Sequence, residues 1–265
     1  METFGTWRLE SLIAVGGLGE VWRANREGTT AAVKRLHTHL MRNEQVLAQF
    51  ATERQLTTTL PHHPHLVHAI DAGDVDGRPF IAMELAPGED VRRLLAPAPN
   101  PRDGSPAPVV LPRSRAIAIM VAACEALSHL HGHGWVHGDL NPGNVIVDDA
   151  DHVMVVDLGV ARAIGEAGEV RGTHAYMAPE QIRGERWTPA TDVFALGVML
   201  WELIANARLF HRGPPWLTMA AVVEAPAPPL ADPALDAIAR AALDKDPVTR
   251  THSAAQLRDA LTALA

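Results

Sequence analysis

The stretch HGDLNPGN, residues 137–144, decides how this chain is interpreted. Asp139 is followed five residues later by Asn144, and a His stands two residues before the Asp. Between them, Pro142 and Gly143 favour a sharp turn that can bring the two side chains to one site. A carboxylate can accept a proton and an amide oxygen can bind magnesium, so the stretch predicts a general base and a metal ligand on one tight loop.

The composition describes an acidic chain with ample material for a core. Among 265 residues, Lys+Arg 23 against Asp+Glu 31 gives a net charge of −8, which argues against nucleic acid or an anionic membrane as the main partner. Hydrophobic residues make up 47%, enough for one large domain or two lobes with a shared core. The only cysteine, Cys124, excludes an intramolecular disulfide. With no signal peptide or membrane-spanning apolar stretch visible, we expect a soluble, cytoplasmic protein.

The first third of the chain alternates between apolar and polar residues, which predicts β-strands. Strands are expected at residues 6–15, 20–25 and 30–36, and two more are expected around the VDGRP turn. Apolar residues recur near the helical period over residues 43–60, and Pro61 ends this pattern. The sequence therefore predicts five strands and one helix.

The rest of the chain is expected to be mostly helical. A Pro-rich stretch at residues 96–114 separates the two parts, and its composition favours a long surface loop. Helices are expected at residues 115–131, 191–205, 234–243 and 253–264, with short extended pieces at NVIVDD and HVMVVDLG.

Two features of the first part suggest phosphate binding. In AVGGLGEV, residues 14–21, small residues at a turn between strands let backbone N–H groups approach phosphate oxygens, although an ordinary hairpin explains them equally well. Lys34 ends the apolar stretch AAVK, where its charge needs a partner, and Glu53 follows 19 residues later in the predicted helix. A Lys–Glu pair would hold the ammonium against phosphates. Alternatively, each side chain lies on the solvent face of its own element.

A second carboxylate belongs to this pattern. VVDLG places Asp157 at the end of a short apolar strand, where it suits a magnesium ion that bridges phosphates. Asp-Gly and Asn-Pro pairs are also ordinary turn formers, so no single piece is decisive. Their order is more specific, because a strand Lys, a helix Glu, an Asp-to-Asn interval of five residues and an Asp-x-Gly 13 residues later are typical of phosphoryl-transfer enzymes.

With these residues in view, the chain resembles the catalytic domain of eukaryotic-like Ser/Thr protein kinases common in bacteria, nearly from end to end. The stretch GTHAYMAPEQ matches the family's P+1 loop and A-P-E motif. The stretch TDVFALGVMLWEL matches the helix whose Asp, here Asp192, supports the catalytic loop. The stretch DKDPVTR matches the segment whose Arg pairs with the Glu of the A-P-E motif. The resemblance implies an α+β, bilobal fold for a single domain of residues 1–265. Residues 1–85 would form a small five-stranded antiparallel sheet lobe with one main helix, and residues 86–265 a larger, mostly helical lobe.

The resemblance also implies the catalytic roles. Asp139 would be the catalytic base, Thr173 would contact this Asp, and Lys34, paired with Glu53, would position phosphates. ATP with Mg²⁺, or Mn²⁺, would be the cofactor, and a Ser or Thr of a protein the acceptor.

Metal and nucleotide ligands follow from the same resemblance. The metal would be held by Asn144 and Asp157, and Met83 would be the gatekeeper before a hinge whose backbone bonds adenine. The expected nucleotide-binding residues are Val15, Gly16, Gly17, Gly19, Val21, Ala32, Lys34, Met83, Glu84 and Ala86.

The chain departs from the family pattern at three points. Ala14 replaces the first Gly of the glycine loop, and Asn141 replaces the Lys that contacts the γ-phosphate, which keeps a donor but loses a charge worth ~2–4 kcal/mol of barrier. Gly138 replaces the Arg that in many protein kinases binds a phosphate on the activation loop. That loop, residues 158–172, contains no Ser, Thr or Tyr, so we expect no phosphorylation switch there.

Three functions fit these observations. The favoured one is an ATP-dependent Ser/Thr protein kinase that transfers the γ-phosphoryl group to protein hydroxyls. A pseudokinase that binds nucleotide or a partner protein is favoured by Asn141 and Ala14 but opposed by the complete set of catalytic residues. A small-molecule phosphotransferase, such as an aminoglycoside or choline kinase, shares H-G-D with an Asn five residues after the Asp. The segment GTHAYMAPEQ opposes this last alternative, because it shapes a site for an extended peptide.

Overall fold

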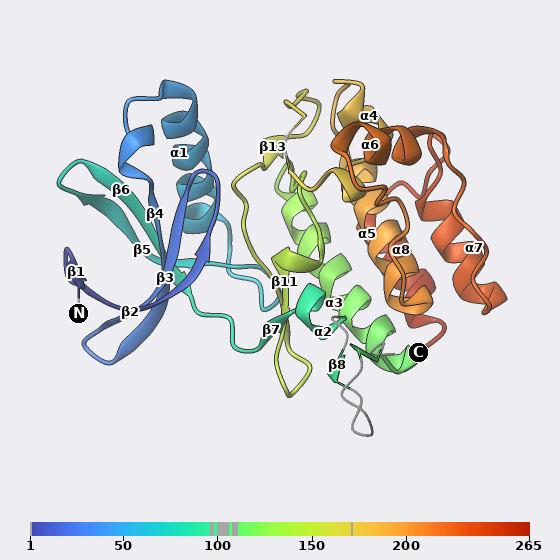
Figure 1. Ribbon diagram of the computed structural model, residues 1–265, viewed down its shortest axis with the longest axis horizontal. Coiled ribbons are helices and arrows are strands. Elements are labelled where there is room, and N and C mark those ends of the chain that lie inside the picture. Colours follow the sequence, from blue (N-terminus) through green and yellow to red (C-terminus); the bar gives the residue numbers. More distant parts are fainter. Residues whose placement is uncertain (1, 96–97, 100–105, 108–110, 171) are drawn as a thin grey trace.

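The protein is built from a sheet-rich N-terminal part and a helical C-terminal part (Figure 1). The computed structural model describes residues 2–95, 98–99, 106–107, 111–170 and 172–265. The α+β architecture that the sequence predicts is confirmed, with an antiparallel sheet and one main helix followed by a mostly helical lobe.

The N-terminal sheet has six strands in the described residues, ordered β1-β2-β3-β4-β6-β5 and antiparallel throughout. They are β1 (Glu2–Phe4), β2 (Trp7–Val15), β3 (Gly19–Arg26), β4 (Thr29–Leu36), β5 (Ala69–Val75) and β6 (Arg78–Glu84). The five expected strands are all present, and β1 is an addition. This strand is only three residues long, too short for a pattern, but buried Phe4 fixes it by packing edge-on against Phe80.

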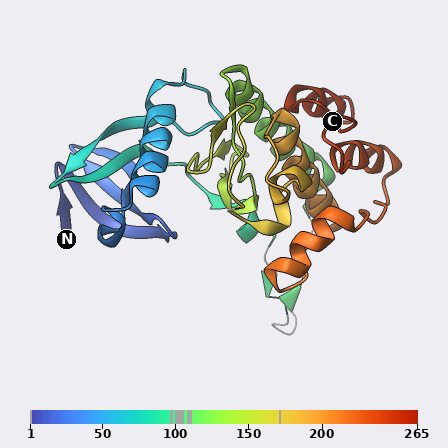
Figure 2. The ribbon, with the colours of Figure 1, turned by 90° about the horizontal axis from the view of Figure 1, so that it is seen from above.

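Helix α1 (Glu44–Thr59) contacts β5 and β6, and Figure 2 shows it running alongside the sheet. Asn43 caps its first turn by accepting a hydrogen bond from the Val46 amide at 3.2 Å, and the helix ends just before Pro61. Its buried positions recur at helical spacing and include Phe50 and Glu53. The helical period therefore points the Glu53 carboxylate into the protein.

The C-terminal part contains helices of very different length. They are α2 (Val91–Leu94), α3 (Arg113–Gly132), α4 (Pro179–Ile182), α5 (Pro189–Ala205), α6 (Pro215–Glu224), α7 (Pro233–Ala242) and α8 (Ala254–Thr262). Helix α5 is central: it is buried over most of its length and contacts α3, α7 and α8. Of the helices in the described residues, none combines the length and the apolar character that crossing a bilayer requires. Three helices were not predicted from the sequence: α2 and α4, which are single turns, and α6, which is flanked by prolines.

Short strands and turns complete the fold. One small sheet consists of β7 (Glu89–Asp90), β11 (Val145–Val147) and β12 (Val153–Val155). Two further pairs of strands are β10 (Trp135–Val136) with β13 (Arg162–Ala163), and β8 (Ala98–Pro99) with β9 (Pro106–Ala107). Single 3₁₀ turns lie at Thr38–Leu40, Pro142–Asn144 and His174–Tyr176.

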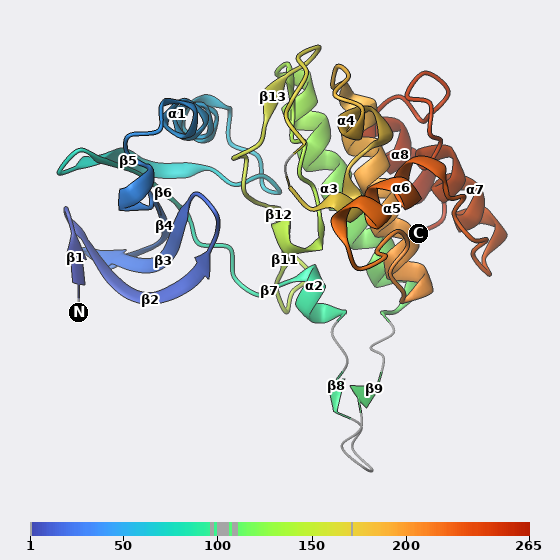
Figure 3. The ribbon, with the colours of Figure 1, turned by 45° about the horizontal axis from the view of Figure 1, so that its top comes forward.

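The predicted Pro-rich loop at residues 96–114 lies mostly outside the described residues. Where it is described, β8 and β9 pair at a point where the chain projects away from the helical part (Figure 3), and α3 begins at Arg113, two residues before the predicted start. A long loop without regular structure is therefore not the whole description of this stretch.

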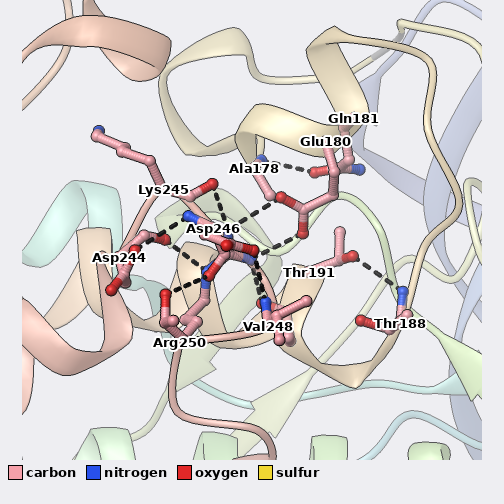
Figure 4. Close-up of polar contacts among 12 residues, drawn as sticks. Ala178, Glu180, Gln181, Thr188, Thr191, Asp244, Lys245, Asp246, Val248 and Arg250 are labelled. Carbon is pink, nitrogen blue, oxygen red and sulfur yellow. Dashed lines mark hydrogen bonds and ion pairs between the residues drawn. The ribbon is translucent and has the colours of Figure 1, made fainter.

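A buried ion pair joins the end of the chain to α4 (Figure 4). Arg250 donates from Nη1 and Nη2 to the two carboxylate oxygens of Glu180 at 2.7 and 2.9 Å, and both residues are almost fully buried. Arg250 Nη1 also donates to the carbonyl of Ala190 at 2.7 Å. Breaking such a pair leaves a buried charge without a partner and costs ~3–5 kcal/mol, so this contact fixes α4 against the start of α5.

Candidate active site

One buried carboxylate holds the loop that carries Asp139. Asp192, in the first turn of α5, accepts hydrogen bonds from the backbone amides of His137 at 2.8 Å and Gly138 at 2.9 Å, and its Oδ2 lies 2.8 Å from His131 Nε2. Burial alone would raise the pKa of Asp192, but the hydrogen bonds and charge of these neighbours hold this pKa below its usual range. The carboxylate therefore stays ionised and fixes the loop to the central helix.

Asp139 lies in this loop, mostly removed from solvent. Its Oδ1 accepts a hydrogen bond from the Thr173 backbone amide at 2.9 Å, so the expected contact of Thr173 with this Asp is made by the main chain. Its carbonyl accepts from Asn141 Nδ2 and from Asn144 Nδ2, both at 2.9 Å. Burial raises the pKa of Asp139, and the Thr173 amide offsets only part of this effect. A carboxylate with a raised pKa is a stronger proton acceptor.

Asn141 turns back into its own loop. Its Oδ1 accepts a hydrogen bond from the Gly143 amide at 2.9 Å and so caps the Pro142–Asn144 turn. Its Nδ2 donates to the Asp139 carbonyl and lies 3.4 Å from Asp139 Oδ1. The side chain is buried and both ends of its amide are engaged. Asn141 thus shapes the loop and orients Asp139, a different geometry from the phosphate contact of the Lys that it replaces.

Lys34, Glu53 and Asp157 meet at one point. Lys34 Nζ, on β4, donates to Glu53 Oε1 at 2.6 Å and Oε2 at 2.8 Å, and to Asp157 Oδ1 at 2.7 Å. The Glu53 side chain is buried and the Lys34 side chain is only 12% exposed, so the solvent-face alternative is wrong. Burial alone would lower the pKa of Lys34, but the two carboxylates raise it above its usual value. The ammonium is therefore charged and joins sheet, helix and the segment after β12.

Asn144 and Asp157 offer the donor set that magnesium prefers. In the described residues, the structure records no donor to Asn144 Oδ1 or to Asp157 Oδ2, and the Asp157 side chain is 47% exposed. One carboxylate and one amide oxygen are hard ligands suited to Mg²⁺ with water and phosphate completing its shell. These two residues fit the metal that the sequence predicts.

The glycine loop closes the end of the β2–β3 hairpin. The Gly16 amide donates to the Gly19 carbonyl at 2.8 Å, and the space beside Gly17 is open. Val15 is largely exposed on β2, and Val21 pairs with Lys34 across β3 and β4. The expected loop residues therefore border the strand that carries the lysine.

The expected hinge lies at the end of β6 and in the residues that follow this strand. Met83 is buried and pairs with Ala32 of β4. The Glu84 amide donates to the His68 carbonyl at 3.0 Å, and in the described residues no backbone hydrogen bond outside the helices and strands uses the Ala86 amide. A carbonyl acceptor and an amide donor two residues apart can bond the edge of a planar base.

Two glutamines that support the site were missed by the sequence analysis. Gln181 donates to the Gly138 carbonyl at 2.8 Å and accepts from the Ala178 amide at 2.9 Å, and Gln49 donates to the Gly159 carbonyl. Gln49 precedes Glu53 by four residues and so shares its helix face, a signal that the sequence did contain. The contact of Gln181 joins residues 43 apart, and no local pattern reveals it.

Comparisons with known proteins identify the family of this chain. The model of the protein kinase domain family matches residues 7–258. Serine/threonine-protein kinase PknA of Mycobacterium tuberculosis is 33% identical over 98% of this chain and 61% of that protein. PknB of Mycolicibacterium smegmatis is 34% identical over 95% of this chain and 42% of that protein, and pkn3 of Myxococcus xanthus is 32% identical over 97% and 50%. The chain belongs to the protein kinase domain family, and it spans 61% or less of these relatives' lengths.

The contact of Lys34 with two carboxylates predicts how a variant without the ammonium responds to pH. In Lys34→Met, buried Glu53 loses its counter-charge, so the free energy of unfolding should fall by ~3–5 kcal/mol at neutral pH. Burial already raises the pKa of Glu53. A group whose pKa is higher in the folded than in the unfolded protein stabilises the fold below the unfolded pKa, and this stabilisation is lost as pH rises. The loss of unfolding free energy in Lys34→Met should therefore grow from about pH 5 to about pH 8.

Urea unfolding of Lys34→Met and of the natural protein at both pH values measures this difference. The control is Lys34→Met combined with Glu53→Gln, which removes the ionisable group and should reduce the pH dependence. An equal deficit at both pH values would show that Glu53 does not depend on the ammonium.

Proposed function

We propose that this chain is an ATP- and magnesium-dependent Ser/Thr protein kinase that transfers the γ-phosphoryl group of ATP to protein hydroxyls. The observation that carries the proposal is the contact of Lys34 Nζ with both Glu53 and Asp157, because it joins the sheet, α1 and the segment after β12 at one site. Asp139 and Asn144 lie on the adjacent loop, where Asn144 Nδ2 donates to the Asp139 carbonyl. The active site then lies between a sheet lobe, residues 1–85, and a helical lobe, residues 86–265.

In this proposal, Asp139 accepts or orients the proton of the substrate hydroxyl. Its raised pKa favours that role, and the hydrogen bond from the Thr173 amide fixes the direction of its carboxylate. Lys34 holds the phosphates in place, and Glu53 keeps its ammonium in position. Mg²⁺ bound by Asn144 and Asp157 would neutralise charge on the phosphates.

The nucleotide is proposed to lie against the glycine loop and the hinge. Gly16, Gly17 and Gly19 would present backbone N–H groups to phosphate oxygens.

The adenine would lie near Ala32 and Met83, which pair across β4 and β6, with Val15 and Val21 also beside it. The carbonyl of Glu84 and the amide of Ala86 would bond its edge.

Activity is proposed to be independent of phosphorylation in the activation loop. Residues 158–172 contain no hydroxyl side chain, and Gly138 offers no guanidinium to bind a phosphate. The Thr173 amide already contacts Asp139. The loop therefore reaches the catalytic Asp without a phosphate to position it.

A pseudokinase is the second candidate, and Asn141 is the observation that favours it. No lysine ammonium occupies this place, and the Asn141 amide is engaged within the loop. A small-molecule phosphotransferase is the third candidate.

A transfer assay separates the three candidates. The chain is incubated with labelled ATP and Mg²⁺, with a generic basic protein or with an aminoglycoside or choline, beside an Asp139→Asn control. We expect label on the protein substrate, and little with Asp139→Asn, because the base is lost. Label on the small molecule alone would favour the third candidate. A rate equal to that of Asp139→Asn would contradict the enzyme and favour the pseudokinase.

The contacts of Asn141 predict two opposed effects of restoring the family's lysine. In Asn141→Lys the side chain cannot accept the Gly143 amide, so the turn loses a cap worth about 1 kcal/mol of stability. The ammonium would supply a charge worth ~2–4 kcal/mol of barrier, so kcat should rise while the free energy of unfolding falls. Asn141→Asp keeps the acceptor but places a like charge beside Asp139, which should raise the pKa of Asp139 and shift the acidic limb of the kcat profile to higher pH.

Both variants are measured at saturating ATP across the pH range. A kcat for Asn141→Lys at or below that of the natural protein would show that the loop geometry held by the Asn141 cap outweighs the restored charge.

A further inference from the structure

Trp187 lies against both the catalytic loop and the activation loop. It is fully buried in the segment between α4 and α5. A Cβ at Gly138 would lie 2.3 Å from Trp187 Cζ3, and a Cβ at Gly168 would lie 2.2 Å from Trp187 Cζ2. No real Cβ tolerates such distances, so both positions must be glycine while the indole is present. The ring therefore fills the space in which a side chain at position 138 would begin.

The main chain around Trp187 is bonded to the same loop. The Gly165 amide donates to the Trp187 carbonyl at 2.8 Å, and the Trp187 amide donates to the Glu166 carbonyl at 2.9 Å. Ala167 and Arg186 form an antiparallel bridge. The segment 165–168 of the activation loop is thus paired with the segment that leads into α5.

This attachment lies close to the catalytic Asp along the chain. Gly168 precedes Thr173 by five residues, and the Thr173 amide donates to Asp139 Oδ1. A short connection limits how far its ends can separate, so holding residues 165–168 restricts where Thr173 can go. Loss of the attachment would release the contact that orients Asp139.

The indole works by packing and not by a polar contact. In the described residues, its buried Nε1 has no hydrogen-bond partner, which is an energetic cost. A large aromatic ring offsets this cost through apolar burial and dispersion. A phosphate–arginine contact can be made or removed by phosphorylation or dephosphorylation, whereas this packing contains no group that a kinase or phosphatase modifies.

We propose that Trp187 is a positioning residue that holds the activation loop against the catalytic loop, in the place where many protein kinases use an arginine and a phosphate. The proposal rests on the function proposed above and gives its phosphorylation independence a physical cause. It also explains Gly138, since an arginine there would collide with the indole.

Hydrogen exchange of the whole chain tests the attachment without requiring activity. In Trp187→Ala, the amides of residues 163–168 should exchange faster by about tenfold or more, because opening of this segment then breaks only the paired backbone and no longer the packing of the ring. Trp201→Ala is the matched control. Trp201 is also a buried tryptophan, but it lies on α5 and donates its Nε1 to the Pro228 carbonyl at 2.8 Å. This control should lower Tm and leave exchange in the activation loop unchanged.

Gly168→Ala is a second variant that creates no cavity and lies in a surface loop. Its methyl group would collide with Trp187, so residues 163–168 should again exchange faster. Trp187→Ala combined with Gly168→Ala removes the collision, and the double variant should exchange no faster than Trp187→Ala alone. Both single variants should lower kcat for the protein substrate and leave KM for ATP unchanged, because the glycine loop and hinge are untouched.

The outcomes separate this proposal from the proposed function. Faster exchange in both single variants, with no phosphoryl transfer by the natural protein, would support the attachment and contradict the kinase. Exchange equal to that of the natural protein in Gly168→Ala would overturn the attachment, even if Trp187→Ala fails to fold. Equal exchange acceleration in Trp201→Ala would also overturn it, because the effect would then be general destabilisation.

Discussion

The site depends on one buried carboxylate. Asp192 accepts the backbone amides of His137 and Gly138 and so fixes the main chain immediately before Asp139. Its charge in a dry environment is stabilised by these donors and by His131, which explains why its pKa is lowered despite burial. Because α5 is the central helix of the larger lobe, the direction of Asp139 is set by the core of the protein.

Gly138 is the point where three supports meet. Its amide donates to Asp192, its carbonyl accepts from Gln181, and its α-carbon lies beside Trp187. All three supports come from the segment that runs from α4 into α5, and the Glu180–Arg250 pair ties that segment to the end of the chain. The stability of the fold and the geometry of the loop that carries Asp139 are therefore maintained by the same contacts.

Local patterns in the sequence predicted what local physics determines. Strand alternation and helical period predicted five strands and α1, and the spacing of motifs indicated which residues belong to one site, but whether Glu53 points inward or to solvent was left open. The sequence missed β1 and the single-turn helices because they are too short to show a period. It could not show that Asn141 caps its own turn or that Trp187 lies beside Gly138, since these depend on packing between distant segments.

We propose that packing holds this site in a working arrangement without phosphate on the activation loop. The most direct test is the initial rate of transfer to a protein substrate after phosphatase treatment, with mass spectrometry to establish that no phosphate remains. We predict the same rate before and after treatment. A fall to the rate of Asp139→Asn, restored by phosphorylation near Thr173, would contradict it.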